Sequence, residues 1–233
     1  MNQHTLPTLF IETATPRCSV GLLDADGEWS ELEVEGKGSH SKALDAQVNQ
    51  LLKERGVDAE AIKSIVLGRG PGSFTGLRIG ASFVRGFCFG RDIPIRMMDT
   101  LIALAGRVCF ENVENVNLDA IQEIHAILDA RRTHVYHWSG TCVTTPEGVQ
   151  RLETISSQAI RPIEDVEARL SEVSSAVLTG FGMERLTISN PEIQRFDPPE
   201  YLTRGQRWLF HTQNAHKYMQ VTTAKDAVPL YLS

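Results

Sequence analysis

The same order of apolar runs and turns occurs twice in this chain, and this repeat limits the folds that the chain can adopt. In the first half, three strand-like runs between residues 8 and 34 precede a helical pattern, a fourth run at residues 65–67 and a group of glycines. Residues 124–182 follow the same order, although the halves share little residue identity. The first run of each half ends in an acid, Glu12 and Asp129. A repeat on this scale indicates a duplicated structural unit.

The repeat predicts an α/β fold of two similar lobes, each with the order βββαβα. We expect an N-terminal lobe at residues 1–108 and a smaller C-terminal lobe at 109–233, with a polar boundary near residues 111–117. Two such lobes are typical of the actin-like fold (ASKHA, ribonuclease H-like), in which ATP lies between the lobes. A single α+β domain with a coincidental order of elements is the alternative, and 233 residues suffice for either.

A glycine-rich stretch at residues 68–80 connects the run Ile65–Leu67 to a helical pattern that reaches about Phe89. Such a turn directs free N–H groups and the positive end of the helix dipole outward, which favours an anion. The spacing matches neither G-x-x-x-x-G-K-[ST] nor G-x-G-x-x-G. It also lacks the G-x-S-x-G arrangement of a hydrolase nucleophile, so Ser73 is predicted to cap the helix.

The helix that follows the glycines carries two apolar rows on a helical wheel. One row is predicted to face the sheet and consists of Phe74, Leu77, Ala81, Val84 and Cys88. The second row consists of Gly76, Gly80, Phe83 and Phe87. A glycine inside a helix costs about 1 kcal/mol relative to alanine, so we expect close approach by a neighbouring helix to offset that cost. The neighbour is either the helical pattern around Leu44–Leu52 or another subunit.

The amino-acid composition limits the classes of function that this chain can have. A net charge of -6 and a pI near 5.7 provide no basic surface, so any RNA contact is expected to need a partner. The four cysteines form no C-x-x-C pair, which fits a reducing cytoplasm. No apolar run approaches 18 residues and no targeting segment is visible, so the expectation is a soluble cytoplasmic protein without membrane contact.

The titratable residues indicate no metal site, because no two of the seven histidines are four residues apart as on a metal-binding helix. Glu12 and Asp129 are placed to face each other across a cleft as ATP–Mg acids, although turn capping is the favoured interpretation. The candidate anion or nucleotide contacts are Glu12, Thr13, Gly72, Ser73 and Arg78. No residue is predicted to be catalytic.

Residues 70–80, Gly-Pro-Gly-Ser-Phe-Thr-Gly-Leu-Arg-Ile-Gly, resemble the signature of the TsaB (YeaZ) family. Further matching segments are Glu12-Thr13-Ala14-Thr15, Ser39-His40-Ser41, Asp129-Ala130-Arg131 with Val135-Tyr136, and Pro229-Leu230-Tyr231-Leu232. The resemblance is strong to about residue 138. Glu12 stands where the family usually has Asp, and Ser233 where it often has Arg.

The resemblance implies a scaffold or activating subunit without chemistry of its own. Such a subunit binds a TsaD-like catalytic subunit, together with a TsaE-like ATPase, for threonylcarbamoyl transfer to adenosine 37 of ANN-decoding tRNAs. It implies no cofactor except ATP or ADP at the interface with partners, a homodimer when alone, and tRNA contact only through the complex. The expected partner-interface residues are Gly76, Gly80, Phe83, Phe87, Leu44 and Gln47. The alternative is an ATP-binding enzyme of the actin-like superfamily with its own phosphotransfer or hydrolase activity.

Overall fold

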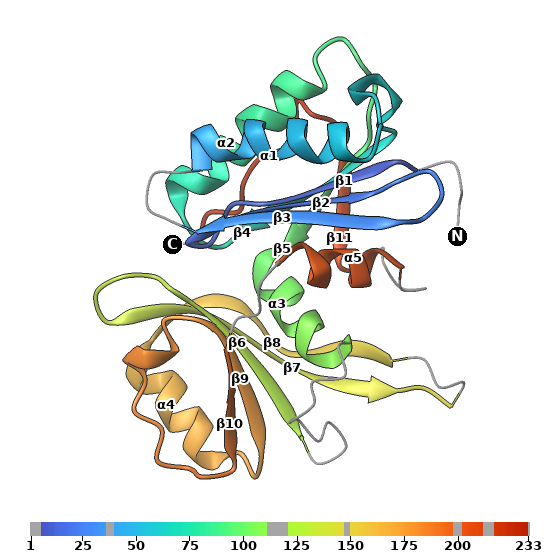
Figure 1. The fold of residues 1–233 in the computed structure, drawn as a ribbon. Helices are drawn as coiled ribbons and strands as arrows, with labels where there is room; N and C mark the ends of the chain where they lie inside the picture. The colour runs from blue at the N-terminus through green and yellow to red at the C-terminus, as the bar shows by residue number, and fades with distance from the viewer. Residues whose placement is uncertain are drawn as a thin grey trace. The chain divides into compact units, whose positions relative to one another are not determined.

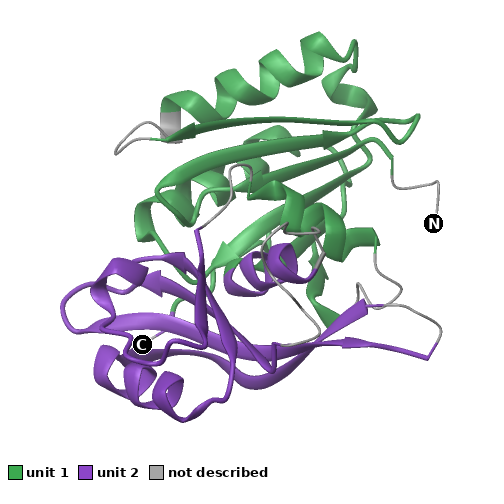
Figure 2. Cartoon of the chain, turned by 60° about the horizontal axis from the view of Figure 1, so that its bottom comes forward, with its two compact units in different colours: residues 1–100, 200–231 green, residues 101–199, 232–233 purple. Residues whose placement is uncertain are grey.

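The chain folds into two compact units, each containing one β-sheet (Figure 1). The computed structural model describes residues 6–35, 40–110, 121–146, 150–197, 202–211 and 217–232. Unit 1 contains residues 1–100 and 200–231, and unit 2 contains residues 101–199 with the last two residues (Figure 2). The predicted α/β class is confirmed.

Unit 1 is built on a six-stranded mixed sheet with the order β11-β5-β4-β1-β2-β3. Its strands are β1 (Thr8–Glu12), β2 (Arg17–Leu23), β3 (Trp29–Glu35), β4 (Ser64–Gly70), β5 (Ile95–Asp99) and β11 (Met219–Thr222). Short turns join β1, β2 and β3 as antiparallel neighbours, whereas β4 pairs in parallel with both β1 and β5. The first four predicted runs therefore form strands.

Three helices cover the two faces of this sheet. Helices α1 (His40–Glu54) and α2 (Phe74–Phe87) lie on one face, and α5 (Thr203–His211) lies on the other (Figure 1). Side chains alternate along a strand, so Leu9 and Ile11 of β1 join the core under α1 and α2, whereas Phe10 contacts Phe210 of α5. The alternating side chains of β1 thus support helices on both faces of the sheet.

The C-terminal tail belongs to unit 1, which corrects the predicted lobe at residues 109–233. β11 pairs antiparallel with β5, and Phe210 lies edge-on to Phe10 with ring centroids 5.4 Å apart. The tail covers the edge of β5 and an apolar face that the N-terminal residues alone leave open. A boundary near residue 108 could be read from local polarity, but strand pairing over more than a hundred residues could not.

Unit 2 has a five-stranded sheet with the order β10-β9-β6-β7-β8. Its elements are α3 (Thr100–Phe110), β6 (Glu123–Asp129), β7 (His134–Thr144), β8 (Gln150–Pro162), α4 (Ile163–Glu172), β9 (Ala176–Phe181) and β10 (Ile193–Phe196). β8 is longer than the predicted run at residues 149–153. The predicted boundary at 111–117 lies outside the described residues.

The last helix predicted for the second lobe is replaced by a short 3-10 turn at Met183–Arg185. The residues that follow include β-branched side chains and Pro191, which are poor helix formers. The chain then enters β10, which pairs in parallel with β9. None of the helices in the described ranges is long and apolar enough to cross a membrane.

Candidate functional site

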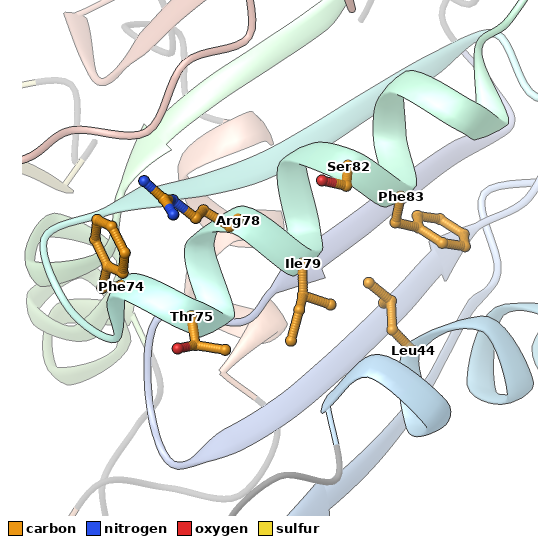
Figure 3. Close-up of a pocket in the computed structure, with 7 residues that line it drawn as sticks. All are labelled: Leu44, Phe74, Thr75, Arg78, Ile79, Ser82 and Phe83. Atoms are coloured by element: carbon orange, nitrogen blue, oxygen red, sulfur yellow. The ribbon is translucent and has the colours of Figure 1, made fainter.

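A shallow groove of about 570 Å³ lies along the outer side of α2 (Figure 3). Its lining consists of Leu44, Phe74, Thr75, Arg78, Ile79, Ser82 and Phe83. Leu44 comes from α1 and points toward the Ile79 and Phe83 side of α2, while Phe74 and Arg78 lie together at the other end. The Arg78 guanidinium lies 3.8 Å from the Phe74 ring centroid, and Phe74 is 52% exposed. The groove is therefore an accessible apolar surface with a cation at one end.

The glycine turn begins α2 at a fixed place. Gly70 and Gly72 adopt φ values of 96° and 152°, and a Cβ on Gly72 would lie 2.2 Å from the Ala14 carbonyl oxygen. The Ser73 N–H donates to that same carbonyl at 2.6 Å, and the Ser73 hydroxyl accepts from the Gly76 N–H at 3.1 Å. The predicted capping role of Ser73 is confirmed, and two N–H groups of the turn are used within the chain.

Gly76 and Gly80 face the sheet, which corrects their prediction as partner-interface residues. A Cβ on Gly76 would lie 1.9 Å from the Thr13 carbonyl oxygen, and one on Gly80 would lie 2.6 Å from the Thr13 hydroxyl. The close approach that we expected from a neighbouring helix is made by the turn after β1. Both glycines lie on the buried side of α2, against the turn after β1, so neither is available to another protein.

Leu44 and Gln47, two of the predicted partner-interface residues, are also buried, which corrects the prediction for Gln47. The Gln47 side-chain amide donates to the Cys18 carbonyl at 3.3 Å, and only Leu44 contributes to the groove. Phe83 and Phe87 are partly buried and pack against the unit 1 core, with their rings stacked 5.7 Å apart. Of the two neighbours considered for the second apolar row, the same unit therefore provides the contacts of Phe83 and Phe87.

Of the exposed residues in the groove, the sequence singled out only Arg78 as a site residue, and it did not indicate that the groove continues into the tail. A second hollow of about 310 Å³ is lined by Arg78, Ala81, Ser82, Arg85, Val228, Pro229 and Tyr231. The Tyr231 ring lies 5.4 Å from that of Phe74, and Arg85 donates to the Ala227 carbonyl at 3.2 Å. The helical wheel places Phe74 in the sheet-facing row, but in the structure this first residue of α2 lies on the outer side of the helix.

Glu12 at the end of β1 is enclosed by donors from three segments. Its carboxylate accepts from the Ala14 N–H at 2.8 Å, the Thr100 hydroxyl at 3.0 Å and the Gln206 amide at 3.2 Å. A Cβ on Gly68 would lie 2.2 Å from Glu12 Oε2, so Gly68 provides the space for this longer acid. These contacts favour the capping interpretation, because the carboxylate is 1% exposed and already bound to the chain's own groups.

The candidate anion contacts separate into two places. Glu12, Thr13, Gly72 and Ser73 meet where the turn after β1 packs against the start of α2. Arg78 lies on the outer side of the helix, over Phe74. In the part of the chain that the structure describes, no group of three or more His, Cys, Asp or Glu side chains could hold a metal ion.

Glu12→Gln is expected to remove one component of the pH dependence of folding. Burial raises the pKa of Glu12 from 4.5 to about 7, although the Ala14, Thr100 and Gln206 donors oppose the shift. A raised folded-state pKa means that this contribution is fully present below pH 4.5 and is lost as pH rises through 7. The loss is on the order of 2 kcal/mol.

Denaturation at pH 5 and pH 8 measures this contribution. The wild type is expected to lose more stability than Glu12→Gln over that interval, each compared with its own value at pH 5. Equal losses would show that the carboxyl is solvated or paired in the folded state.

Asp129, the corresponding acid of unit 2, is bound by its own unit in a different way. It accepts from the Arg131 N–H at 2.7 Å and forms an ion pair with Arg185 from the turn after β9. The turn-forming interpretation therefore describes its contacts. That Glu12 and Asp129 face each other stays a prediction.

Unit 2 also buries a histidine pair that sequence reasoning did not identify. His125 Nδ1 lies 2.9 Å from His137 Nε2, and His125 Nε2 lies 3.1 Å from a Glu123 oxygen. Glu123 also forms an ion pair with Arg169. The β6–β7 hairpin could have revealed the pair, because a turn at residues 130–133 places both histidines on one face.

Comparison with known proteins identifies relatives of this chain. A family model described as tRNA N6-adenosine threonylcarbamoyltransferase (TsaD) matches residues 35–203. The protein TsaB of tRNA threonylcarbamoyladenosine biosynthesis from Haemophilus influenzae is 34% identical over 133 residues, covering 57% of this chain and 53% of the relative. The Bacillus subtilis TsaB is 31% identical over 128 residues, covering 55% and 52%. The chain thus spans about half the length of the curated relatives that it matches.

The solved structure of YeaZ from Pseudomonas aeruginosa has a TM-score of 0.73 and 28% identity, and covers 97% of this chain and 100% of that one. The two sheets and their helices define a two-lobed α/β protein of the actin-like, TsaD-type fold. Within that class, the chain belongs to the TsaB/YeaZ family.

Proposed function

We propose that this protein is a scaffold subunit in the biosynthesis of threonylcarbamoyladenosine in tRNA, and that it binds a TsaD-like catalytic subunit through the α2 groove. Its relatives from Haemophilus influenzae and Bacillus subtilis are proteins of tRNA threonylcarbamoyladenosine biosynthesis, which suggests the pathway. The observation that supports the binding site is the apolar lining formed by the exposed Phe74 ring and the partly buried Ile79 and Phe83 beside Leu44. Apolar anchors with a polar rim are typical of protein interfaces, and Thr75, Arg78 and Ser82 supply that rim.

The shape of the groove favours a helix as its occupant. α1 and α2 lie side by side on the outside of unit 1, so a partner with the same arrangement could pack two helices against these two. A TsaD-type subunit has a related fold, which the family match to this chain implies. The same self-complementary face would serve a homodimer of the chain when the partner is absent.

The scaffold proposal assigns no reaction to this chain. Glu12 and Asp129 are bound to groups of their own units, so neither supports the alternative of an ATP-hydrolysing or phosphotransfer enzyme. We place ATP or ADP at the interface with the TsaD-like and TsaE-like partners, and tRNA contact in the assembled cytoplasmic complex. Binding of ATP by the isolated chain with Glu12-dependent turnover would contradict this proposal.

Phe74→Asp is expected to weaken binding to the TsaD-like subunit by about 30-fold or more, the effect of losing an interface hot spot. Phe74 is half-exposed and its ring contacts are with Tyr231 and Arg78, so the isolated variant should remain folded. The measurement is isothermal titration calorimetry, with solution mass as a second readout.

Phe89→Asp is the matched control, because it makes the same chemical change just beyond α2 at a side chain that is 89% exposed and outside the groove. Gly80 is unsuitable for this test, since a side chain there would meet Thr13. Wild-type affinity of Phe74→Asp, or equal loss in Phe89→Asp, would place the interface elsewhere.

A further inference from the structure

The turn between β6 and β7 holds two consecutive arginines in a backbone conformation that non-glycine residues rarely adopt. Arg131 and Arg132 have φ values of 69° and 51°. Hairpin turns that need positive φ normally use Gly, Asn or Asp, because a Cβ destabilises this region. Strained backbone conformations of this kind cluster at functional sites, so this exposed turn is a candidate for a functional role.

One local hydrogen bond and two contacts from the distant Arg185 hold this turn in place. The Arg131 N–H donates to Asp129, while the Arg185 guanidinium binds both the Asp129 carboxylate and the Arg132 carbonyl. Arg185 belongs to the short 3-10 turn Met183–Arg185, which follows β9 and begins after Gly182, whose φ is 98°. A side chain more than fifty residues further along the chain therefore fixes the β6–β7 turn.

The turn presents the side chains of Arg131 and Arg132 to solvent without a partner. Both residues are exposed, and neither guanidinium makes a hydrogen bond or an ion pair with any residue that the structure describes. In residues 101–199, acidic residues outnumber arginines and no lysine occurs, so the unit has a net negative charge. Two unpaired cations on an otherwise acidic unit form a local anion-binding surface.

We propose that the Arg131–Arg132 turn binds the phosphodiester backbone of RNA in the assembled complex, an inference that rests on the proposed function. Guanidinium groups bind phosphate oxygens in a bidentate manner, and such contacts orient a nucleic acid without reading its sequence. The turn is the convex end of a hairpin, and neither hollow described above includes it. An exposed turn of this kind suits an extended polyanion, and the Arg185 bridge fixes the backbone that carries both arginines.

The test measures tRNA binding by the complex of this chain with a TsaD-like subunit, at several salt concentrations. Arg131→Ala/Arg132→Ala should weaken binding three- to tenfold at 0.1 M salt. It should also reduce the slope of log K against log salt by about 1 to 2, since each phosphate contact contributes roughly one. Arg131→Lys/Arg132→Lys should retain most of the slope. Arg185→Ala, which keeps both arginines but removes the bridge, should weaken binding in the same direction.

Arg151→Ala/Arg195→Ala is the matched control, because it removes the same charge from β8 and β10. Equal weakening by the control would show an effect of net charge and overturn the assignment. Wild-type affinity and slope in Arg131→Ala/Arg132→Ala, with complex mass unchanged, would overturn it while leaving the scaffold proposal intact. A wild-type chain that fails to form the complex would overturn both.

Discussion

Replacing Gly76 with alanine is expected to destabilise the protein by about 2 kcal/mol or more, whereas the same change at Gly86 should stabilise it by up to about 1 kcal/mol. Both glycines lie within α2. A methyl group at Gly76 would lie 1.9 Å from the Thr13 carbonyl oxygen, a distance that forces the helix away from the β1 turn. At Gly86 nothing lies within 4 Å, so alanine there gains helix propensity without a clash.

Chemical denaturation of the two variants beside the wild type separates these effects. Because intrinsic helix propensity changes equally at both sites, the difference between the variants isolates the contact with Thr13. A stable Gly76→Ala variant would mean that α2 can move outward at little cost. The groove on its outer side would then not be rigidly placed.

Acidification from pH 6.5 to 4 is expected to remove on the order of 4 kcal/mol of stability through the buried histidine pair. Burial lowers the pKa of His125 from 6.5 to about 4 and that of His137 to about 3, with the Arg169 charge adding to the shift in both. Both rings are therefore neutral in the folded protein, while the unfolded chain takes up protons below pH 6.5. Their contribution is complete above pH 6.5 and is lost as pH falls through the folded-state values.

The arrangement of the neutral rings also suggests the variant to use. If His125 Nε2–H donates to Glu123, its Nδ1 accepts from His137 Nε2–H at 2.9 Å. His137→Gln keeps a donor near that position and removes one titrating group, so it should lose less stability between pH 6.5 and 4 than the wild type.

His134→Gln on the same strand is the control, because His134 lies outside the buried pair and should leave the pair's acid dependence in place. Denaturant midpoints at half-unit pH steps provide the measurement. Identical acid profiles of His137→Gln and the wild type would show that the pair is accessible to protons in the folded state.

Local sequence patterns predicted the elements that depend on neighbouring residues. The first strands of each unit follow from short apolar runs between turns, and α2 begins at Ser73 because its hydroxyl can accept from Gly76 three residues later. The TsaB-like segment at residues 70–80 identified the family from the sequence. That segment also directed attention to α2, the helix that lines the groove.

The candidate site residues were predicted less well, because a helical wheel shows that two rows are apolar but not which one faces the sheet. Thr13 determines that orientation, because its carbonyl lies close to Gly76 and its hydroxyl close to Gly80. This contact turns Phe74 outward and places Ile79 in the groove. The glycines that the sequence assigned to a partner are used instead to bring α2 close to β1.

The sequence by itself determined the family, the α/β class, the order of the main strands and the capped start of α2. Only the tertiary structure decided which face of α2 is exposed, where the tail pairs, and that Arg185 holds Arg131 and Arg132 in a strained turn. The first group depends on periodicity and on hydrogen bonds between residues a few positions apart. The second depends on distances between segments that are far apart in the chain, which local patterns do not encode.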